Sequence, residues 1–184
     1  IINSYGADAV RLFILSDSPP EKDVQWSDQG MLASYKFLQK LWTLHKRIKE
    51  KIFNNKIENG ESDELEKFTN QIIYKITNNL ENFNYNVIIA SIYETYNFLN
   101  KEIEKKISTN VLKDSYKKIL VLLCPAIPHF ASECLHELGD DSTIEWPRVN
   151  SKILRDDKID YVIQINGKKR AILNENKDID QESL

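Results

Sequence analysis

Hydrophobic residues recur every three or four positions up to about residue 138, which is the period of an amphipathic helix. Ser27 stands at the start of the longest such segment, where its hydroxyl would cap the first turn. Pro125 and Pro128 divide the last helical segments, because proline interrupts helical hydrogen bonding. The predicted helices span residues 3–16, 28–53, 63–83, 87–103, 111–124 and 128–138.

The hydrophobic period changes near the C-terminus. Residues 161–165 alternate and are rich in β-branched side chains, and Asn166-Gly167 is a strong hairpin signal before a return strand over 168–173. The predicted fold class is mainly α: an antiparallel bundle of four to five helices with a small C-terminal β hairpin. The expected domains are a connector over residues 1–27, the bundle over 28–145, and the truncated start of a second domain over 146–184.

Composition narrows the possible functions. Hydrophobic residues make up 41% of the chain, enough for a core, and the net charge is −3. A free-standing nucleic-acid binder is usually basic, so any RNA contact would have to come from a local basic stripe. No run of apolar residues is long enough for a membrane span. Cys124 and Cys134 lack metal-binding spacing and are expected to be buried thiols in a reducing cytosol.

The residues themselves give no reason to assign catalysis. Neither Gly-rich phosphate-binding loop, GxGxxG or GxxxxGK[ST], occurs in the chain. His45 falls within the apolar face of its predicted helix and is expected to be partly buried and hydrogen-bonded, and His129 is expected to act in capping or in the core. No nucleophile or metal-ligand set accompanies them or His136, so no catalytic or metal residue is assigned.

Binding is the remaining possibility. Four cations, Lys36, Lys40, Arg47 and Lys51, form a narrow row along the predicted long helix, opposite its apolar side. Such a row could follow a phosphate backbone, or it could be an ordinary solvated helix face. A second cluster, Lys168, Lys169 and Arg170, lies beside the predicted hairpin turn, where it could contact RNA or protect a sheet edge.

Several segments resemble class I aminoacyl-tRNA synthetases, in order along nearly the whole chain. Residues 5–13, YGADAVRLF, resemble the segment that follows the KMSKS loop of that class. Residues 18–28, SPPEKDVQWSD, and residues 162–170, VIQINGKKR, are similar to SPPEKD…EWSD and VVQVNGKxR of the bacterial-type leucyl-tRNA synthetase family. Further similar stretches are KFL-x-K-LW over 36–42, FNYN over 83–86, and LLCPAIPH over 122–129.

This resemblance implies the anticodon-binding-type helical domain and the start of the C-terminal domain of a leucyl-tRNA synthetase. The family's HIGH and KMSKS motifs are missing, so the sites for leucine and for ATP with magnesium would lie outside this chain, which would be inactive alone and hold no cofactor. The parent enzyme would be a cytoplasmic monomer that charges tRNA(Leu). The partners implied are tRNA(Leu) and the catalytic domain of the same parent, and the first residue, Ile1, with Met31 as the sole methionine, also suggests a piece of a longer chain.

In this family the helical domain is thought to hold the tRNA body through its backbone. The resemblance therefore favours an RNA-binding role for Lys36, Lys40, Arg47 and Lys51, with Lys168, Lys169 and Arg170 second. Tyr93 and Tyr96 fall among the apolar positions of the predicted 87–103 helix, so they are not expected to read bases. Asp8 and Arg11 could transmit tRNA docking to the active site or form a helix-end salt bridge. The alternatives are the same domain of a valyl or isoleucyl enzyme, or a helical protein-interaction module without RNA binding.

Overall fold

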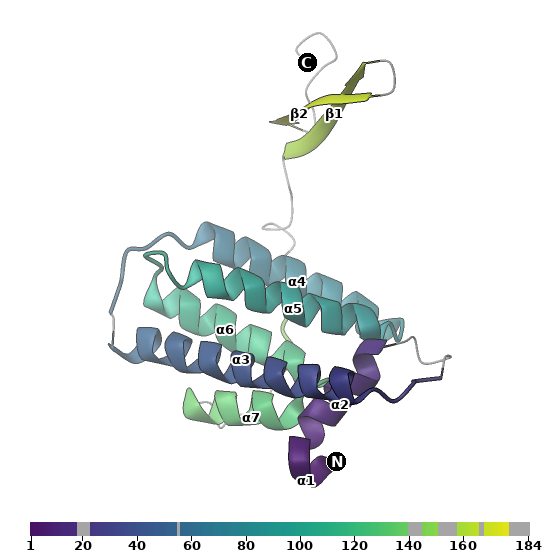
Figure 1. The fold of residues 1–184 in the computed structure, drawn as a ribbon. Helices are drawn as coiled ribbons and strands as arrows, with labels where there is room; N and C mark the ends of the chain where they lie inside the picture. The colour runs from purple at the N-terminus through teal and green to yellow at the C-terminus, as the bar shows by residue number, and fades with distance from the viewer. Residues whose placement is uncertain (18–22, 55, 140–144, 151–157, 166–167, 177–184) are drawn as a thin grey trace. The chain divides into compact units, whose positions relative to one another are not determined.

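The computed structural model describes residues 1–17, 23–54, 56–139, 145–150, 158–165 and 168–176 (Figure 1). The chain forms two compact units, Ile1–Val149 and Asn150–Leu184. Across the described ranges, no helix is both long and apolar enough to cross a membrane.

The first unit is a helical bundle in which successive long helices run in alternating directions (Figure 1). α4 packs against both α5 and α6, α6 packs against α7, and α2 packs against one end of α3 and α5. Their buried side chains form a core of aliphatic and aromatic residues shared by all of the long helices. The helices are α1 (Ile2–Tyr5), α2 (Ala7–Asp17), α3 (Asp28–Asn54), α4 (Asp63–Glu81), α5 (Tyr85–Glu102), α6 (Thr109–Leu123) and α7 (Pro128–Glu137).

The longest helix, α3, begins and faces the core as its sequence predicts. The Ser27 hydroxyl oxygen accepts a hydrogen bond from the backbone N–H of Gly30 at 3.1 Å, which satisfies a donor of the first turn. Its buried side chains recur at spacings of three and four, so that one stripe of the helix meets the core. These buried residues are Met31, Ser34, Phe37, Leu41, Leu44, His45, Ile48 and Ile52.

The connection between α3 and α4 is held against the connection between α5 and α6. Backbone N–H of Thr109 donates to the carbonyl of Ile57 at 2.9 Å, and the Thr109 hydroxyl accepts from the N–H of Ile57 at 2.9 Å. A β-carbon on Gly60 would lie 2.4 Å from the backbone nitrogen of Ser108, so this close approach requires glycine.

The segment after α7 returns to the bundle. The indole N–H of Trp146 donates to the hydroxyl of Thr77 on α4 at 2.9 Å, and Trp146 and Val149 pack against the core. The first unit extends from Ile1 to Val149, and α2 belongs to it because this helix packs on α3 and α5.

The second unit contains strands β1 (Lys158–Ile165) and β2 (Lys168–Asn176), which pair antiparallel. The register shifts between Ile163 and Gln164, which is typical of a β-bulge. The Asn166-Gly167 pair on which the sequence-based hairpin prediction rests lies outside the described residues. The mainly helical fold class is confirmed, and the boundaries of α3 to α7 agree with prediction to within a few residues.

Candidate nucleic-acid interface

A groove between α3 and α5 brings together three of the four cations predicted to bind RNA. Its volume is about 320 Å³. The predicted row therefore lies on the flank of α3 that faces α5, rather than on a side of the helix pointing away from the bundle. The lining residues are Lys36, Gln39, Lys40, Thr43, Leu44 and Arg47 from α3, and Tyr96 and Asn100 from α5.

Lys36 and Lys40 supply free positive charge to this groove. Both side chains are exposed, and neither has a hydrogen-bond or ion-pair partner within the part of the chain that the structure describes. They lie four positions apart on α3, so their ammonium groups project from the same face of the helix. An anion entering the groove would meet two ammonium groups that no carboxylate neutralises.

Arg47, farther along the same groove, is already engaged. Its guanidinium donates a hydrogen bond to the side-chain oxygen of Asn100 at 2.6 Å and forms an ion pair with Glu104. Both partners of the ion pair are substantially exposed, so water and salt weaken the attraction. A phosphate could bind Arg47 only in competition with the Glu104 carboxylate.

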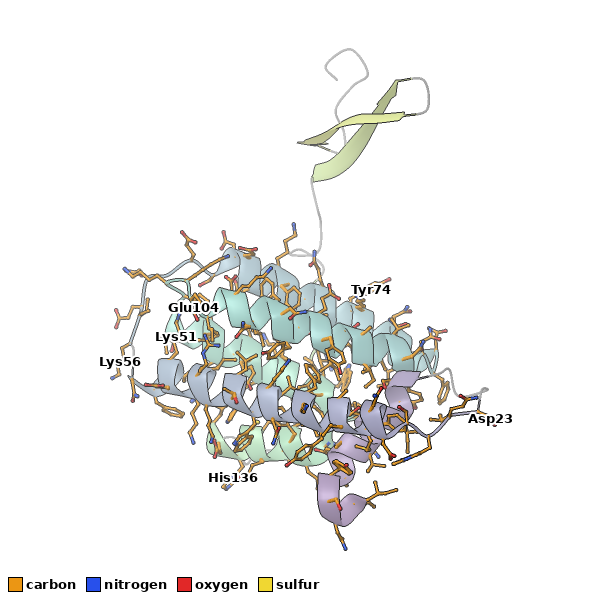
Figure 2. All side chains as sticks on the ribbon, in the orientation of Figure 1. Asp23, Lys51, Lys56, Tyr74, Glu104 and His136 are labelled. Carbon is orange, nitrogen blue, oxygen red and sulfur yellow. The ribbon has the colours of Figure 1, made fainter. Side chains whose placement is uncertain are left out.

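Lys51 caps the C-terminal end of α5 with its ammonium group. Its ammonium donates hydrogen bonds to the carbonyls of Ile103 and Lys105, which follow the last turn of that helix. Burial lowers the pKa of Lys51, and the nearby Glu104 and Glu102 oppose this shift. Figure 2 shows Lys51 and Glu104 at the end of the bundle far from Asp23.

The basic row is therefore divided. Its first half, at Lys36 and Lys40, is free, and its second half, at Arg47 and Lys51, is bound to other groups of the protein. Lys168, Lys169 and Arg170, the second predicted cluster, lie at the start of β2, and their side chains are outside the described part. The groove and this cluster thus belong to different units.

Tyr96 is a groove residue that the sequence-based reasoning assigned to the apolar face of its helix. Its ring packs edge-on against Phe37, with 5.6 Å between ring centroids. The periodicity that predicted burial is consistent with this contact, but it could not reveal that the side chain also lines the groove opposite the lysines. Five aromatic side chains of the described residues are exposed: Trp26, Phe53, Tyr74, Phe83 and Tyr93.

Asp8 and Arg11 hold α2 onto the corner between α6 and α7. The Asp8 carboxylate accepts hydrogen bonds from the N–H of Phe130 at 2.7 Å and from a ring nitrogen of His129 at 2.8 Å, at the start of α7. The Arg11 guanidinium donates to the carbonyls of Pro125 at 2.6 Å and Ala126 at 2.9 Å. An acid at a helix start and a cation beside carbonyls that follow a helix end both complement the helix dipoles. The cap of α7 is therefore the Asp8 carboxylate rather than His129, whose exposed ring donates to that carboxylate.

His45 lies in the core and is fully hydrogen-bonded. One ring nitrogen is 3.1 Å from the hydroxyl of Tyr116, and the other is 3.0 Å from a carboxylate oxygen of Glu137, which also binds Lys49. Burial lowers the pKa of His45 and raises that of Tyr116 well above its usual value, which favours a neutral ring that accepts from the Tyr116 hydroxyl and donates to Glu137. This arrangement stabilises the bundle and leaves no free acid–base pair.

The other polar features of the first unit do not favour catalysis or RNA. A hollow of about 880 Å³ beside the α3–α4 connection has an acidic lining, which disfavours a phosphate backbone. Its charged lining residues are Glu58, Glu61, Asp63 and Glu64, with Lys106 as the one cation among the lining residues described. Among the described residues, no group of three or more His, Cys, Asp or Glu side chains could hold a metal ion. Both cysteines are free thiols, and burial raises their pKa values.

The fold that carries the basic groove matches a known family of domains. The family described as "Anticodon-binding domain of tRNA ligase" matches residues 63–184, about two thirds of the chain. The chain therefore belongs to this family of anticodon-binding domains.

Individual proteins with similar sequences narrow this family to one kind of tRNA ligase. The chain is 34% identical over 185 residues to the leucine–tRNA ligase of Petrotoga mobilis, covering 93% of this chain and 22% of that protein. It is 35% identical over 190 residues to the leucine–tRNA ligase of Prochlorococcus marinus strain MIT 9515, covering all of this chain and again 22% of the relative. The chain thus spans about a fifth of the length of the curated relatives that it matches.

A solved structure shows the same fold. It is the ternary complex of Agrobacterium radiobacter K84 agnB2 LeuRS with tRNA and LeuAMS. The match has a TM-score of 0.81 and 27% identity, and it covers 98% of this chain and 24% of that one. These comparisons favour a synthetase domain over the alternative of a helical protein-interaction module.

Proposed function

We propose that this chain is the tRNA-binding helical domain of a leucine–tRNA ligase and that its α3–α5 groove docks the sugar–phosphate backbone of tRNA(Leu). The parent enzyme would activate leucine with ATP and charge tRNA(Leu) at a catalytic domain outside this chain. The relatives' names and the tRNA complex of the structural neighbour support this assignment. The observation that carries the docking proposal is the pair of uncompensated cations, Lys36 and Lys40, in one groove.

The two halves of the basic row would contribute differently. Lys36 and Lys40 contact phosphates directly and release condensed counterions, which favours binding at low salt. Arg47 contributes only after its guanidinium exchanges the Glu104 carboxylate for a phosphate. Lys51 would have to leave the carbonyls that it caps, so we assign it mainly to holding α5 in place. Contacts of this kind position a tRNA without reading its sequence.

The second unit would add contacts of its own. We propose that β1 and β2 form the hairpin that opens the C-terminal domain, and that Lys168, Lys169 and Arg170 beside the turn bind the RNA backbone. Two weakly binding units on one chain raise each other's effective concentration at a shared RNA. The similarity of residues 162–170 to the VVQVNGKxR segment supports this assignment.

The test is the salt dependence of binding to a leucine tRNA transcript, measured by fluorescence anisotropy with the whole 184-residue chain. In the Lys36→Ala and Lys40→Ala variants, the slope of log affinity against log salt should become shallower by about 0.7–0.9 for each lysine removed. Lys46→Ala is a matched control, because Lys46 is an exposed lysine on α3 that lies over the Trp42 ring, outside the groove.

Two results would reject the docking surface. Unchanged affinity in the Lys36→Ala, Lys40→Ala double variant at low salt would exclude the groove as the RNA contact. An equal loss of affinity in Lys46→Ala would mean that RNA responds to the general charge of the protein.

In the lysine variants, binding of a non-leucine tRNA should weaken by the same factor as binding of leucine tRNA, because phosphate contacts carry no sequence information.

A further inference from the structure

We infer that the hydroxyl of Tyr96 donates a hydrogen bond to a non-bridging phosphate oxygen of RNA bound in the α3–α5 groove. This inference rests on the proposed function and adds a neutral, directional contact to the two lysines. Tyr96 lies on the α5 wall, and Lys36 and Lys40 lie on the α3 wall of the same groove.

The Tyr96 ring is held in position by packing. It meets Phe37 edge-on, with an angle of 76° between the ring planes, and Phe37 is itself only 5% exposed. A tyrosine has few rotatable bonds, and a ring fixed at one edge loses little further freedom when its hydroxyl binds a ligand. The ring that lines the groove is therefore held in one orientation.

The Tyr96 hydroxyl has no partner in the described part of the protein, although the side chain is half-buried. None of the buried side-chain oxygens or nitrogens in that part lacks a hydrogen-bond partner, so the Tyr96 oxygen must be reachable by solvent. Here the donor remains available to a ligand.

Two other polar groups that line the groove are already hydrogen-bonded within the protein, whereas the Tyr96 hydroxyl is not. The Thr43 hydroxyl, which also lines it, donates to the carbonyl of Gln39 at 2.9 Å, and the Asn100 oxygen accepts from Arg47. Lys36 and Lys40 make the surroundings positive, which favours an anionic acceptor. Phosphate oxygens of RNA accept hydrogen bonds from tyrosine hydroxyls as well as from lysines and arginines.

Tyr96→Phe tests the inference, because it removes one oxygen and keeps the ring against Phe37. With the whole chain and a leucine tRNA transcript, the Kd should rise about fivefold, the loss expected for one net hydrogen bond. A neutral donor releases no counterion, so the factor should be the same at every salt concentration and the salt slope should not change. Lys40→Ala, in contrast, should change the slope.

Tyr93→Phe is the matched control. Tyr93 is also on α5 and stacks on Phe37 with 3.7 Å between ring centroids, but it does not line the groove. Its substitution should leave the Kd unchanged, and both variants should unfold at the wild-type temperature.

Each contrary result has a separate meaning. If Tyr96→Phe binds like wild type while Lys40→Ala weakens binding, the hydroxyl contact is refuted and the docking groove stands. If neither variant changes the Kd, both proposals fall. An equal loss in Tyr93→Phe, or a lowered unfolding temperature in Tyr96→Phe, would also overturn the inference, because the effect would then be structural.

Discussion

Replacing Asp8 with alanine should destabilise the bundle more than the loss of an ordinary helix cap. The carboxylate reaches α7 from α2, across 121 residues of sequence, and accepts from a ring nitrogen of His129 at 2.8 Å. It also accepts from the N–H of Phe130 at 2.7 Å. Asp8 is 7% exposed and Phe130 is 8% exposed, so water cannot readily replace the carboxylate at the Phe130 N–H, whereas the His129 side chain is 75% exposed.

The size of this destabilisation can be estimated from the hydrogen bonds that Asp8→Ala removes. Removal of an N-cap residue costs about 0.5–2 kcal/mol, and a hydrogen bond to a charged group contributes about 1.5–3 kcal/mol. These contributions overlap, because the Phe130 N–H belongs to both. We therefore expect Asp8→Ala to lower the free energy of unfolding by about 2–3 kcal/mol, and the midpoint of thermal unfolding by about 5–10 °C. Asp8→Asn keeps one acceptor oxygen, so it should lower the free energy of unfolding by about half as much as Asp8→Ala.

Urea titration followed by circular dichroism would measure the change. Asp114→Ala is the control, because it removes an exposed carboxylate that pairs with Lys118 one helical turn away, a contact that contributes less than about 0.5 kcal/mol. A loss in Asp8→Ala no greater than in Asp114→Ala would refute the reasoning, since the start of α7 would then be stable without the acid from α2.

Two further predictions concern charge. Glu104→Gln should strengthen RNA binding and steepen the salt slope by about 0.7–0.9, because it frees Arg47 for a phosphate; unchanged or weaker binding in anisotropy titrations would contradict this. The free energy of unfolding should fall as pH drops below about 6.5, because burial lowers the pKa of His45 and the unfolded chain then binds a proton that the folded chain does not. Hydrogen bonds from Lys49 and His45 lower the pKa of Glu137 in the folded protein. Glu137 therefore stabilises the fold above about pH 4.5, and this contribution is lost as pH falls through the lowered pKa. Denaturant titrations from pH 7 to 4 would show the decline, and His45→Gln should flatten its upper part; the same decline in that variant would exclude His45 as its cause.

Local patterns determined the helices. Apolar residues at spacings of three and four predicted α3 to α7, and Ser27 predicted the start of α3. The placement of His45 on the apolar face predicted its burial and its hydrogen bonds. These features are set by residues within a few turns of one another, so they can be read along the chain.

Partners distant in sequence were decided by tertiary structure. Arg47 and Glu104 lie 57 residues apart, so no pattern on the long helix could show that one cation of its basic row is paired with a carboxylate. Helical periodicity placed Tyr96 toward other helices, but whether its hydroxyl is covered or lines a groove depends on where α3 crosses α5. A sequence predicts which face of each helix is apolar and which charged residues lie on the other faces. Only the packing of the helices decides which of those charges meet each other and which have no partner among the described residues.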